Sequence, residues 1–160
     1  MTGAGITLVL VRHAKSDWGD PHLDDHDRPL NDRGRRDAAR MARRLAETGF
    51  RPDALVSSTA VRARTTAEAF AEELGAAVTL DPELYGAPAR ARLAAAAATG
   101  VRSVLVVAHD PGMSVLAAQL SGDGIAHMPT CAVATFRWDD GDWDVATAVD
   151  PAEWTIDTPR

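Results

Sequence analysis

The sequence is poor in cysteine and has no long apolar run near its start. Its single cysteine, Cys131, cannot form an intramolecular disulfide, and its apolar neighbours predict a small buried thiol. The first apolar run, Ile6–Val11, is six residues long, shorter than the ~7–15 residues of a signal-peptide core or the ~20 of a membrane span. No basic residue precedes it. We therefore expect a cytoplasmic protein without a membrane segment.

Positive charge is also scarce. The 17 basic residues, of which Lys15 is the one lysine, stand against 23 acidic ones, so the formal net charge is -6. This charge repels phosphate backbones and anionic lipid surfaces, which disfavours nucleic-acid and membrane binding. A composition of 46% hydrophobic and 25% charged residues is ordinary for a globular protein and excludes a disordered chain, a collagen or a coiled coil. At this length we expect one domain over residues 1–160.

Apolar strands and amphipathic helices alternate along the chain. Continuous apolar runs predict strands buried on both faces at Ile6–Val11 and Ser103–Val107, and shorter runs predict strands at Ala54–Ser57 and Ala77–Leu80. Helical spacing with capping and stop residues predicts helices over Asn31–Glu47, Thr59–Leu74, Pro88–Thr99 and Pro111–Leu120. Such alternation predicts an α/β fold, a three-layer sandwich in which helices cover a mostly parallel sheet.

The C-terminal part departs from this alternation. Cys131–Trp138 and Trp143–Val149 are rich in strand-forming residues and are separated by an Asp-Gly turn sequence. We expect them to form an antiparallel hairpin at the edge of the sheet. The tryptophans Trp138, Trp143 and Trp154 are expected to pack around this hairpin and the C-terminus.

Histidines follow both of the long buried strands. His13 comes directly after the first strand, in Arg12-His13-Ala14-Lys15-Ser16, and His109 follows the later one. Because the carboxyl ends of parallel strands meet at one edge of a sheet, we expect both rings to face one crevice. Arg62, in the first turn of a helix, should point there too. Guanidinium groups match the oxygens of a phosphoryl group, and a neutral imidazole is a nucleophile, so the pattern predicts a phosphate site.

These segments resemble the histidine phosphatase superfamily, whose signature begins with a strand that runs into Arg-His-Gly. Leu10–Ser16, Ser57–Ala67 and Val106–Gly112 match its motifs in the family's order. The resemblance implies a phosphoglycerate mutase-like fold in which His13 is the phosphorylated nucleophile. It also implies that Arg12 and Arg62 bind the phosphoryl oxygens and that His109 stabilises the group in transfer.

A narrower resemblance concerns the short length and the segments Arg12–Ser16, Asp27–Gly34 and His109–Gly112, which look most like the SixA-type phosphohistidine phosphatases. It implies hydrolysis of phosphohistidine in a phosphorylated protein, with no metal and no organic cofactor. Two alternatives stay open. One is a phosphomonoesterase acting on a small phosphorylated metabolite, with Glu83 as the acid that protonates the leaving oxygen. The other is a phosphate-recognition module without turnover.

The polar segment between the first strand and the first helix has several further candidates. Ser16 is a possible substrate contact, and Trp18 is placed to form an aromatic wall at the mouth of the pocket. The acids and histidines of the acidic loop, Asp20–Asp27, fit no calcium or zinc spacing, so we expect a solvated loop. Arg28 is expected to hold this loop by pairing with a neighbouring aspartate.

Overall fold

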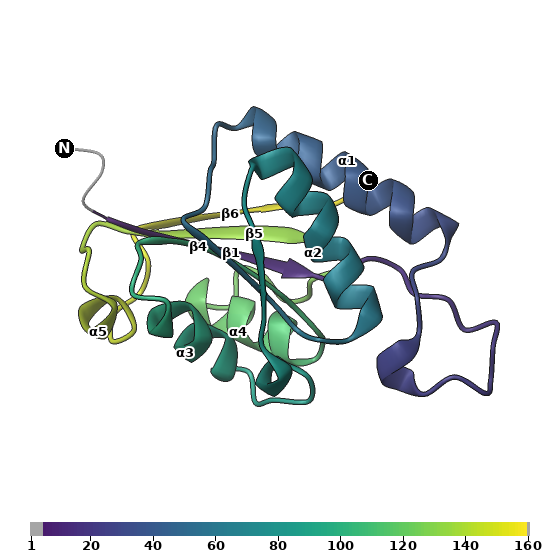
Figure 1. Cartoon of the computed structure of the whole chain (residues 1–160). Coiled ribbons are helices and arrows are strands. Elements are labelled where there is room, and N and C mark those ends of the chain that lie inside the picture. Colours follow the sequence, from purple (N-terminus) through teal and green to yellow (C-terminus); the bar gives the residue numbers. More distant parts are fainter. Residues whose placement is uncertain (1–4, 160) are drawn as a thin grey trace.

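The computed structural model describes residues 5–159 and places six strands in one mixed sheet between two layers of helices (Figure 1). The order across the sheet is β3-β2-β4-β1-β5-β6. The strands are β1 Ile6–Arg12, β2 Ala54–Ser57, β3 Val78–Leu80, β4 Ser103–Ala108, β5 Val133–Trp138 and β6 Glu153–Asp157. The pairs β1–β4, β4–β2 and β2–β3 are parallel, whereas β5 pairs antiparallel with both β1 and β6. The predicted α/β fold with a mostly parallel sheet is confirmed.

The centre of the sheet is formed by β1 and β4, and helices cover both of its faces. Their aliphatic residues are fully buried, which explains the continuous apolar runs in the sequence. β4 lies between β1 and β2, with Arg12 opposite Ala108 and Ser57 opposite Val107. This register brings the carboxyl ends of three strands level, so the residues that follow them emerge at one edge.

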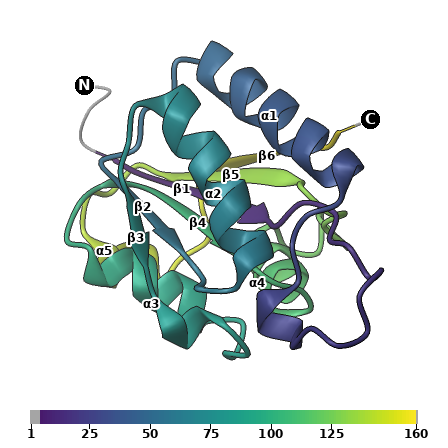
Figure 2. The same ribbon diagram turned by 45° about the vertical axis from the view of Figure 1, so that its right-hand side comes forward.

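The helices divide between the two faces of the sheet (Figures 1 and 2). One face carries α1 (Asp32–Glu47) and α2 (Val61–Leu74), and the other carries α3 (Ala91–Ala98), α4 (Gly112–Leu120) and the short α5 (Trp143–Ala146). Each face has its own cluster of buried apolar side chains. Among residues 5–159, no helix combines the length and the apolar character needed to cross a membrane.

Local sequence signals account for the ends of the two long helices. The side chain of Asn31 accepts a hydrogen bond from the backbone N–H of Gly34 (2.8 Å) and so caps α1. α2 ends at Gly75, whose φ of 68° lies in the left-handed region that favours glycine. Both positions agree with the boundaries expected from the sequence.

The expected hairpin strand at Trp143–Val149 is wrong. Residues Trp143–Ala146 form α5 instead, because the side chain of Asp142 accepts a hydrogen bond from the N–H of Asp144 (2.8 Å) and caps a helix there. The indole N–H of Trp143 donates to the carbonyl oxygen of Val101 (2.7 Å), which anchors the side chain in the core. β5 therefore pairs with β6, a segment in which the sequence analysis expects no strand.

A loop of irregular backbone joins β1 to α1 and contains the short 3-10 helix η1 (Asp25–Asp27). Its two ends are held together, because Ser16 and Leu30 form an isolated bridge and the N–H of Asp17 donates to the carbonyl oxygen of Pro29 (2.8 Å). The first turn of α1 packs against the start of this loop. A Cβ atom at Gly34 would overlap the carbonyl oxygen of Lys15, so this close approach requires glycine.

We expect Gly34→Ala to lower the free energy of unfolding by about 1–3 kcal/mol, the usual cost of inserting a methyl group into a packed contact. The measurement is urea denaturation followed by circular dichroism. Arg36→Ala is the control, because Arg36 is exposed on the same helix, and it should change the free energy by less than about 0.5 kcal/mol. Equal effects of the two substitutions would contradict the close approach at Gly34.

Candidate active site

The four side chains expected to form the site lie around one cavity at the carboxyl edge of the sheet. Arg12 ends β1 and His13 follows it, His109 follows β4, and Arg62 lies in the first turn of α2. The cavity has a volume of about 310 Å³. Its wall consists of Arg12, His13, Lys15, Ser16, Trp18, Arg28, Arg62, His109, Asp110 and Thr130. Ser16, the further candidate from the sequence, is therefore part of the same wall.

His13 is buried, and a backbone contact fixes its ring. Its Nδ1 lies 2.8 Å from the carbonyl oxygen of Ala14. Because a carbonyl oxygen only accepts hydrogen bonds, the proton sits on Nδ1 and Nε2 keeps its lone pair. Burial lowers the pKa of His13 to about 4. The hydrogen bond to Ala14 opposes this shift, and the positive charge of Arg62 adds a smaller contribution to it. His13 is thus a neutral imidazole with a nucleophilic nitrogen at neutral pH.

His109 lies beside His13, with the two ring centroids 5.1 Å apart. Its Nε2 is 2.8 Å from Oγ of Ser58, and this oxygen accepts a hydrogen bond from the N–H of Ala60 (3.3 Å). This arrangement favours donation from the Ser58 hydroxyl to Nε2, which places the ring proton on Nδ1. Burial lowers the pKa of His109 to about 3, and repulsion from Arg62 and from His13, once His13 is protonated at low pH, contributes to the shift. Its ring is neutral as well.

Arg12 is held at one end of its guanidinium group. Nη1 donates to the carbonyl oxygen of Met128 (2.9 Å) and lies 3.5 Å from Oδ2 of Asp110. Asp110 in turn accepts hydrogen bonds from the backbone N–H and the hydroxyl of Ser114 (2.8 and 2.7 Å). The start of α4 therefore orients Arg12 through Asp110.

Several buried donors at the cavity lack an acceptor within the protein. Among residues 5–159, Arg12 Nε, Arg62 Nε and His109 Nδ1 are buried atoms without a hydrogen-bond partner. All three residues line the cavity. A buried donor without an acceptor costs roughly 1–3 kcal/mol, and phosphoryl oxygens are strong acceptors. The guanidinium and imidazole groups of this wall suit the cavity to a bound anion.

Arg28 contributes a third guanidinium group to the cavity, a place that no motif in the sequence indicates. Its pairing with a neighbouring aspartate is confirmed, since Nη2 donates to Oδ1 of Asp25 (2.9 Å). Nη1 donates to Oγ of Ser16 (2.5 Å), and the guanidinium carbon lies 3.4 Å from the ring centroid of Trp18. Trp18 lines the cavity, as expected for an aromatic wall. Burial of Arg28, which no sequence pattern signals, is what adds it to the site.

Tyr85 and Asp25 also lie beside the site, although the sequence analysis assigns neither to it. The ring of Tyr85 stands edge-on to His109, with centroids 5.4 Å apart, and its hydroxyl donates to Oδ2 of Asp25 (2.6 Å). Asp25 further accepts two hydrogen bonds from Arg62, at Oδ2 (2.9 Å) and at its backbone carbonyl (2.5 Å). These partners are separated by 60 and 37 residues, so no local motif reveals the contacts.

A second cavity, of about 590 Å³, adjoins the first. Arg62, His109 and Asp110 line both cavities. The remaining wall of the second cavity is mostly small and apolar and includes Gly86, Ala87, Pro88, Ala89, Pro111, Gly112 and Val115, with Asp25, Tyr85 and Arg92. A group that extends from an anion bound in the first cavity would have room here.

Arg92 connects two segments of the second cavity's wall. It is 2% exposed, and it donates to the carbonyl oxygen of Pro88 from Nη1 (2.8 Å) and to that of His109 from Nη2 (3.1 Å). A Cβ atom at Gly112 would overlap its guanidinium group. Arg92 thus links the segment after η2 (Pro82–Leu84) to the loop that carries His109.

Glu83 is not brought to the site. It is exposed in η2, where its N–H donates to Oδ1 of Asp81 (3.0 Å), and it lines neither cavity. A catalytic role for Glu83 stays a prediction that this geometry does not favour.

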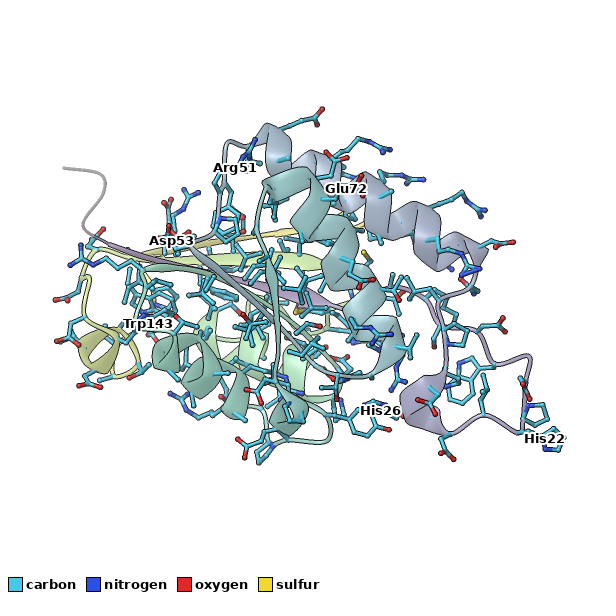
Figure 3. All side chains as sticks on the ribbon, in the orientation of Figure 1. His22, His26, Arg51, Asp53, Glu72 and Trp143 are labelled. Carbon is cyan, nitrogen blue, oxygen red and sulfur yellow. The ribbon has the colours of Figure 1, made fainter. Side chains whose placement is uncertain are left out.

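The acidic loop is exposed over most of its length, as expected. Figure 3 shows His22 at its outer end, whereas His26 lies between the loop and the body of the protein. Nε2 of His26 is 2.8 Å from Oγ1 of Thr59, next to α2. Within residues 5–159, no three histidine, cysteine, aspartate or glutamate side chains converge in a way that could hold a metal ion.

Residues 8–86 match the family model described as the histidine phosphatase superfamily, branch 1. This segment contains Arg12, His13 and Arg62. A solved structure assigned as phosphohistidine phosphatase SixA, from Nakamurella multipartitia, is 31% identical, has a TM-score of 0.83 and aligns over 98% of this chain and 97% of its own. The chain belongs to the histidine phosphatase superfamily. It is a phosphatase, and hence a hydrolase, with the phosphoglycerate mutase-like fold of that superfamily.

Two other relatives of this histidine phosphatase cover nearly its whole length. The protein assigned as phosphohistidine phosphatase SixA in Agrobacterium tumefaciens is 30% identical, with a TM-score of 0.77 and 94% of each chain aligned. An uncharacterized chloroplastic protein of Arabidopsis thaliana is 30% identical over 98% of this chain and 78% of its own. The likeness therefore extends past the segment matched by the family model and includes His109.

We expect the imidazole of His13 to titrate near pH 4, well below the ordinary histidine value of 6.5, because burial disfavours its charged form. As the pH falls from 7 towards 4, its Nε2 stays unprotonated and able to act as a nucleophile. The measurement is a nitrogen-15 NMR titration of the histidine side chains. Loss of one set of signals in His13→Gln assigns the resonance, and a titration midpoint near 6.5 would contradict the desolvated site.

Proposed function

We propose that this phosphatase acts on phosphohistidine in proteins, through a phosphohistidine intermediate formed on His13. The observation that carries the proposal is the neutral imidazole of His13, whose Nε2 has a free lone pair and which shares its cavity with three guanidinium groups. Imidazole nitrogen attacks phosphorus readily, and guanidinium groups bind phosphoryl oxygens in a fixed geometry. The likeness to proteins assigned as SixA supports phosphohistidine as the substrate.

In the first step, Nε2 of His13 attacks the phosphorus atom in line and forms a new P–N bond. The bond from phosphorus to the substrate imidazole breaks, and the leaving nitrogen keeps the electron pair and takes a proton from water. Arg12, Arg62 and the Nδ1–H of His109 bind the equatorial oxygens, on which charge is spread in the transition state. In the second step, water attacks the phosphoryl group on His13 and releases a proton to solvent, which replaces the proton taken up in the first step. The P–N bond breaks, inorganic phosphate leaves, and Nε2 regains its lone pair.

Three titratable groups near the cavities, Asp25, His109 and Glu83, favour a leaving group that needs no acid from them. The hydrogen bond from Tyr85, aided by Arg28 and Arg62, holds the pKa of Asp25 well below its usual range, so this carboxylate has no proton to give. Burial keeps His109 neutral, and Glu83 lines neither cavity. An alkoxide requires a proton donor to leave, whereas a histidine nitrogen is readily protonated by solvent. These features support an N-linked phosphoryl group over an ester.

The second cavity supports a protein side chain as the leaving group. Its charged residues already have partners within the protein, since Asp25 binds Arg62, Asp110 binds Ser114, and Arg92 binds backbone carbonyls. The rest of the wall is mostly small and apolar. A polyhydroxylated or doubly phosphorylated metabolite finds few free polar partners on such a wall, whereas an imidazole and its neighbouring residues find apolar contacts.

We expect His13→Gln to lower the turnover of a phosphohistidine peptide by about 1,000-fold or more, because the nucleophile is lost. The wild type, mixed with peptide labelled in its phosphoryl group and quenched rapidly, should carry an alkali-stable, acid-labile label that His13→Gln lacks. The matched control is His22→Gln, which alters an exposed histidine of the acidic loop and should keep full activity. Full turnover by His13→Gln would reject the mechanism, and binding without turnover in the wild type would identify a recognition module.

We expect the metal-free wild type to hydrolyse a phosphohistidine peptide faster than a phosphoserine peptide or a sugar phosphate. Glu83→Gln should leave the phosphohistidine rate within about twofold of the wild type, since a true general acid contributes roughly 100-fold or more. Glu72→Gln, at an exposed position of α2, is the control. A preference for the esters that Glu83→Gln removes would favour the phosphomonoesterase instead.

A further inference from the structure

Asp25 is the member of the acidic loop that turns towards the site. Its Oδ1 accepts hydrogen bonds from Nη2 (2.9 Å) and Nε (3.3 Å) of Arg28. Its Oδ2 accepts from Nη2 of Arg62 (2.9 Å) and from the hydroxyl of Tyr85 (2.6 Å). The backbone carbonyl of Asp25 accepts a further bond from Nη1 of Arg62 (2.5 Å). Asp25 therefore binds both arginines, and Tyr85 binds Asp25.

The carboxylate of Asp25 lies outside the phosphate cavity, in the wall of the adjoining one. Arg28 and Arg62 line the cavity of about 310 Å³, whereas Asp25 and Tyr85 line only the adjoining one. Both arginine side chains are nearly buried, at 7–8% exposure, while that of Asp25 is half exposed. The bonds to Asp25 engage Nη1 and Nη2 of Arg62 and leave its buried Nε without a protein partner. Asp25 thus contacts the guanidinium groups without entering the space for the phosphoryl group.

Charge makes this contact important for the geometry of the site. Two guanidinium groups at one cavity repel each other, and an ionised carboxylate shared between them offsets that repulsion. The hydrogen bond from Tyr85 is the largest cause that holds the pKa of Asp25 far below its ordinary value. Arginine forks bound to a carboxylate in this way keep a fixed direction, which a phosphoryl group with oxygens at defined angles requires.

We propose that Asp25 is a positioning residue that holds Arg62 and Arg28 in the orientation that binds the phosphoryl group, and that Tyr85 orients Asp25. The inference rests on the proposed function, because it takes the cavity to be the phosphoryl site. It assigns a role to the acidic loop that its sequence does not disclose. The opposite reading, in which the carboxylate competes with phosphate for Arg62, predicts effects of the opposite sign.

The test compares Asp25→Asn with Asp27→Asn, its matched control in the same 3-10 turn. The side chain of Asp27 is largely exposed, and its ionic contact is with His26 (3.6 Å) rather than with an arginine. Binding of inorganic phosphate is measured by titration calorimetry, and KM and kcat are measured with a phosphohistidine peptide. We expect Asp25→Asn to weaken phosphate binding and raise KM by about tenfold, the size of one charge-assisted hydrogen bond. Asp27→Asn should match the wild type in both measurements.

Two further variants separate positioning from a general loss of structure. Tyr85→Phe keeps the ring beside His109 but removes the hydroxyl, so it should weaken phosphate binding in the same direction and by a smaller factor. In an Arg62→Ala background, Asp25→Asn should weaken binding by clearly less than it does in the wild type, because one of the two arginines that Asp25 positions is absent. A purely structural effect would instead lower the urea midpoint and add fully to the effect of Arg62→Ala.

Phosphate binding that is unchanged or tighter in Asp25→Asn would overturn the inference, and tighter binding would identify the carboxylate as a competitor. Full additivity with Arg62→Ala would overturn it as well. A wild-type protein that binds no phosphate would contradict the proposed function, and this inference with it. Normal binding and turnover in the wild type with no difference between the Asp25 and Asp27 variants overturns the inference alone.

Discussion

The parallel register of β1, β4 and β2 is the constraint on which the rest of this structure depends. Because Arg12 stands opposite Ala108 and Ser57 opposite Val107, three strands end at the same level. Residues that are distant in the sequence then leave the sheet side by side, and the short connections into α2 and α4 keep them there. A shift of one residue in the pairing of β1 with β4 would turn Arg12 to the other face of the sheet.

Burial at this edge decides which chemistry is available. Desolvation keeps both histidines neutral. One of them can therefore attack phosphorus, and neither carries the additional proton of an imidazolium ion. The positive charge that an anionic substrate needs comes from arginines, which stay protonated when partly buried. The nucleophile is thus a neutral histidine, whereas the positive charge for the anion comes from arginines, and a single desolvated cavity satisfies both requirements.

Much of the fold was predictable because apolar runs of the right length have few alternatives to a buried strand, as at Ile6–Val11. The site was predictable where a motif follows such a strand, as for His13 and His109. Asp25 and Tyr85 were not, because their contacts join irregular segments through tertiary packing. The error at Trp143–Val149 has a different source: the apolar pattern suits a strand, yet capping by Asp142 and the buried indole of Trp143 decide for a helix.

The buried guanidinium of Arg92 has a consequence for the shape of the second cavity. Since it is bonded to carbonyl oxygens on both sides of the second cavity, it acts as a rigid spacer between Pro88 and His109. Its side chain therefore braces two segments of the cavity wall against each other. Under the proposed function, a leaving group would meet a wall whose shape depends on this one buried side chain.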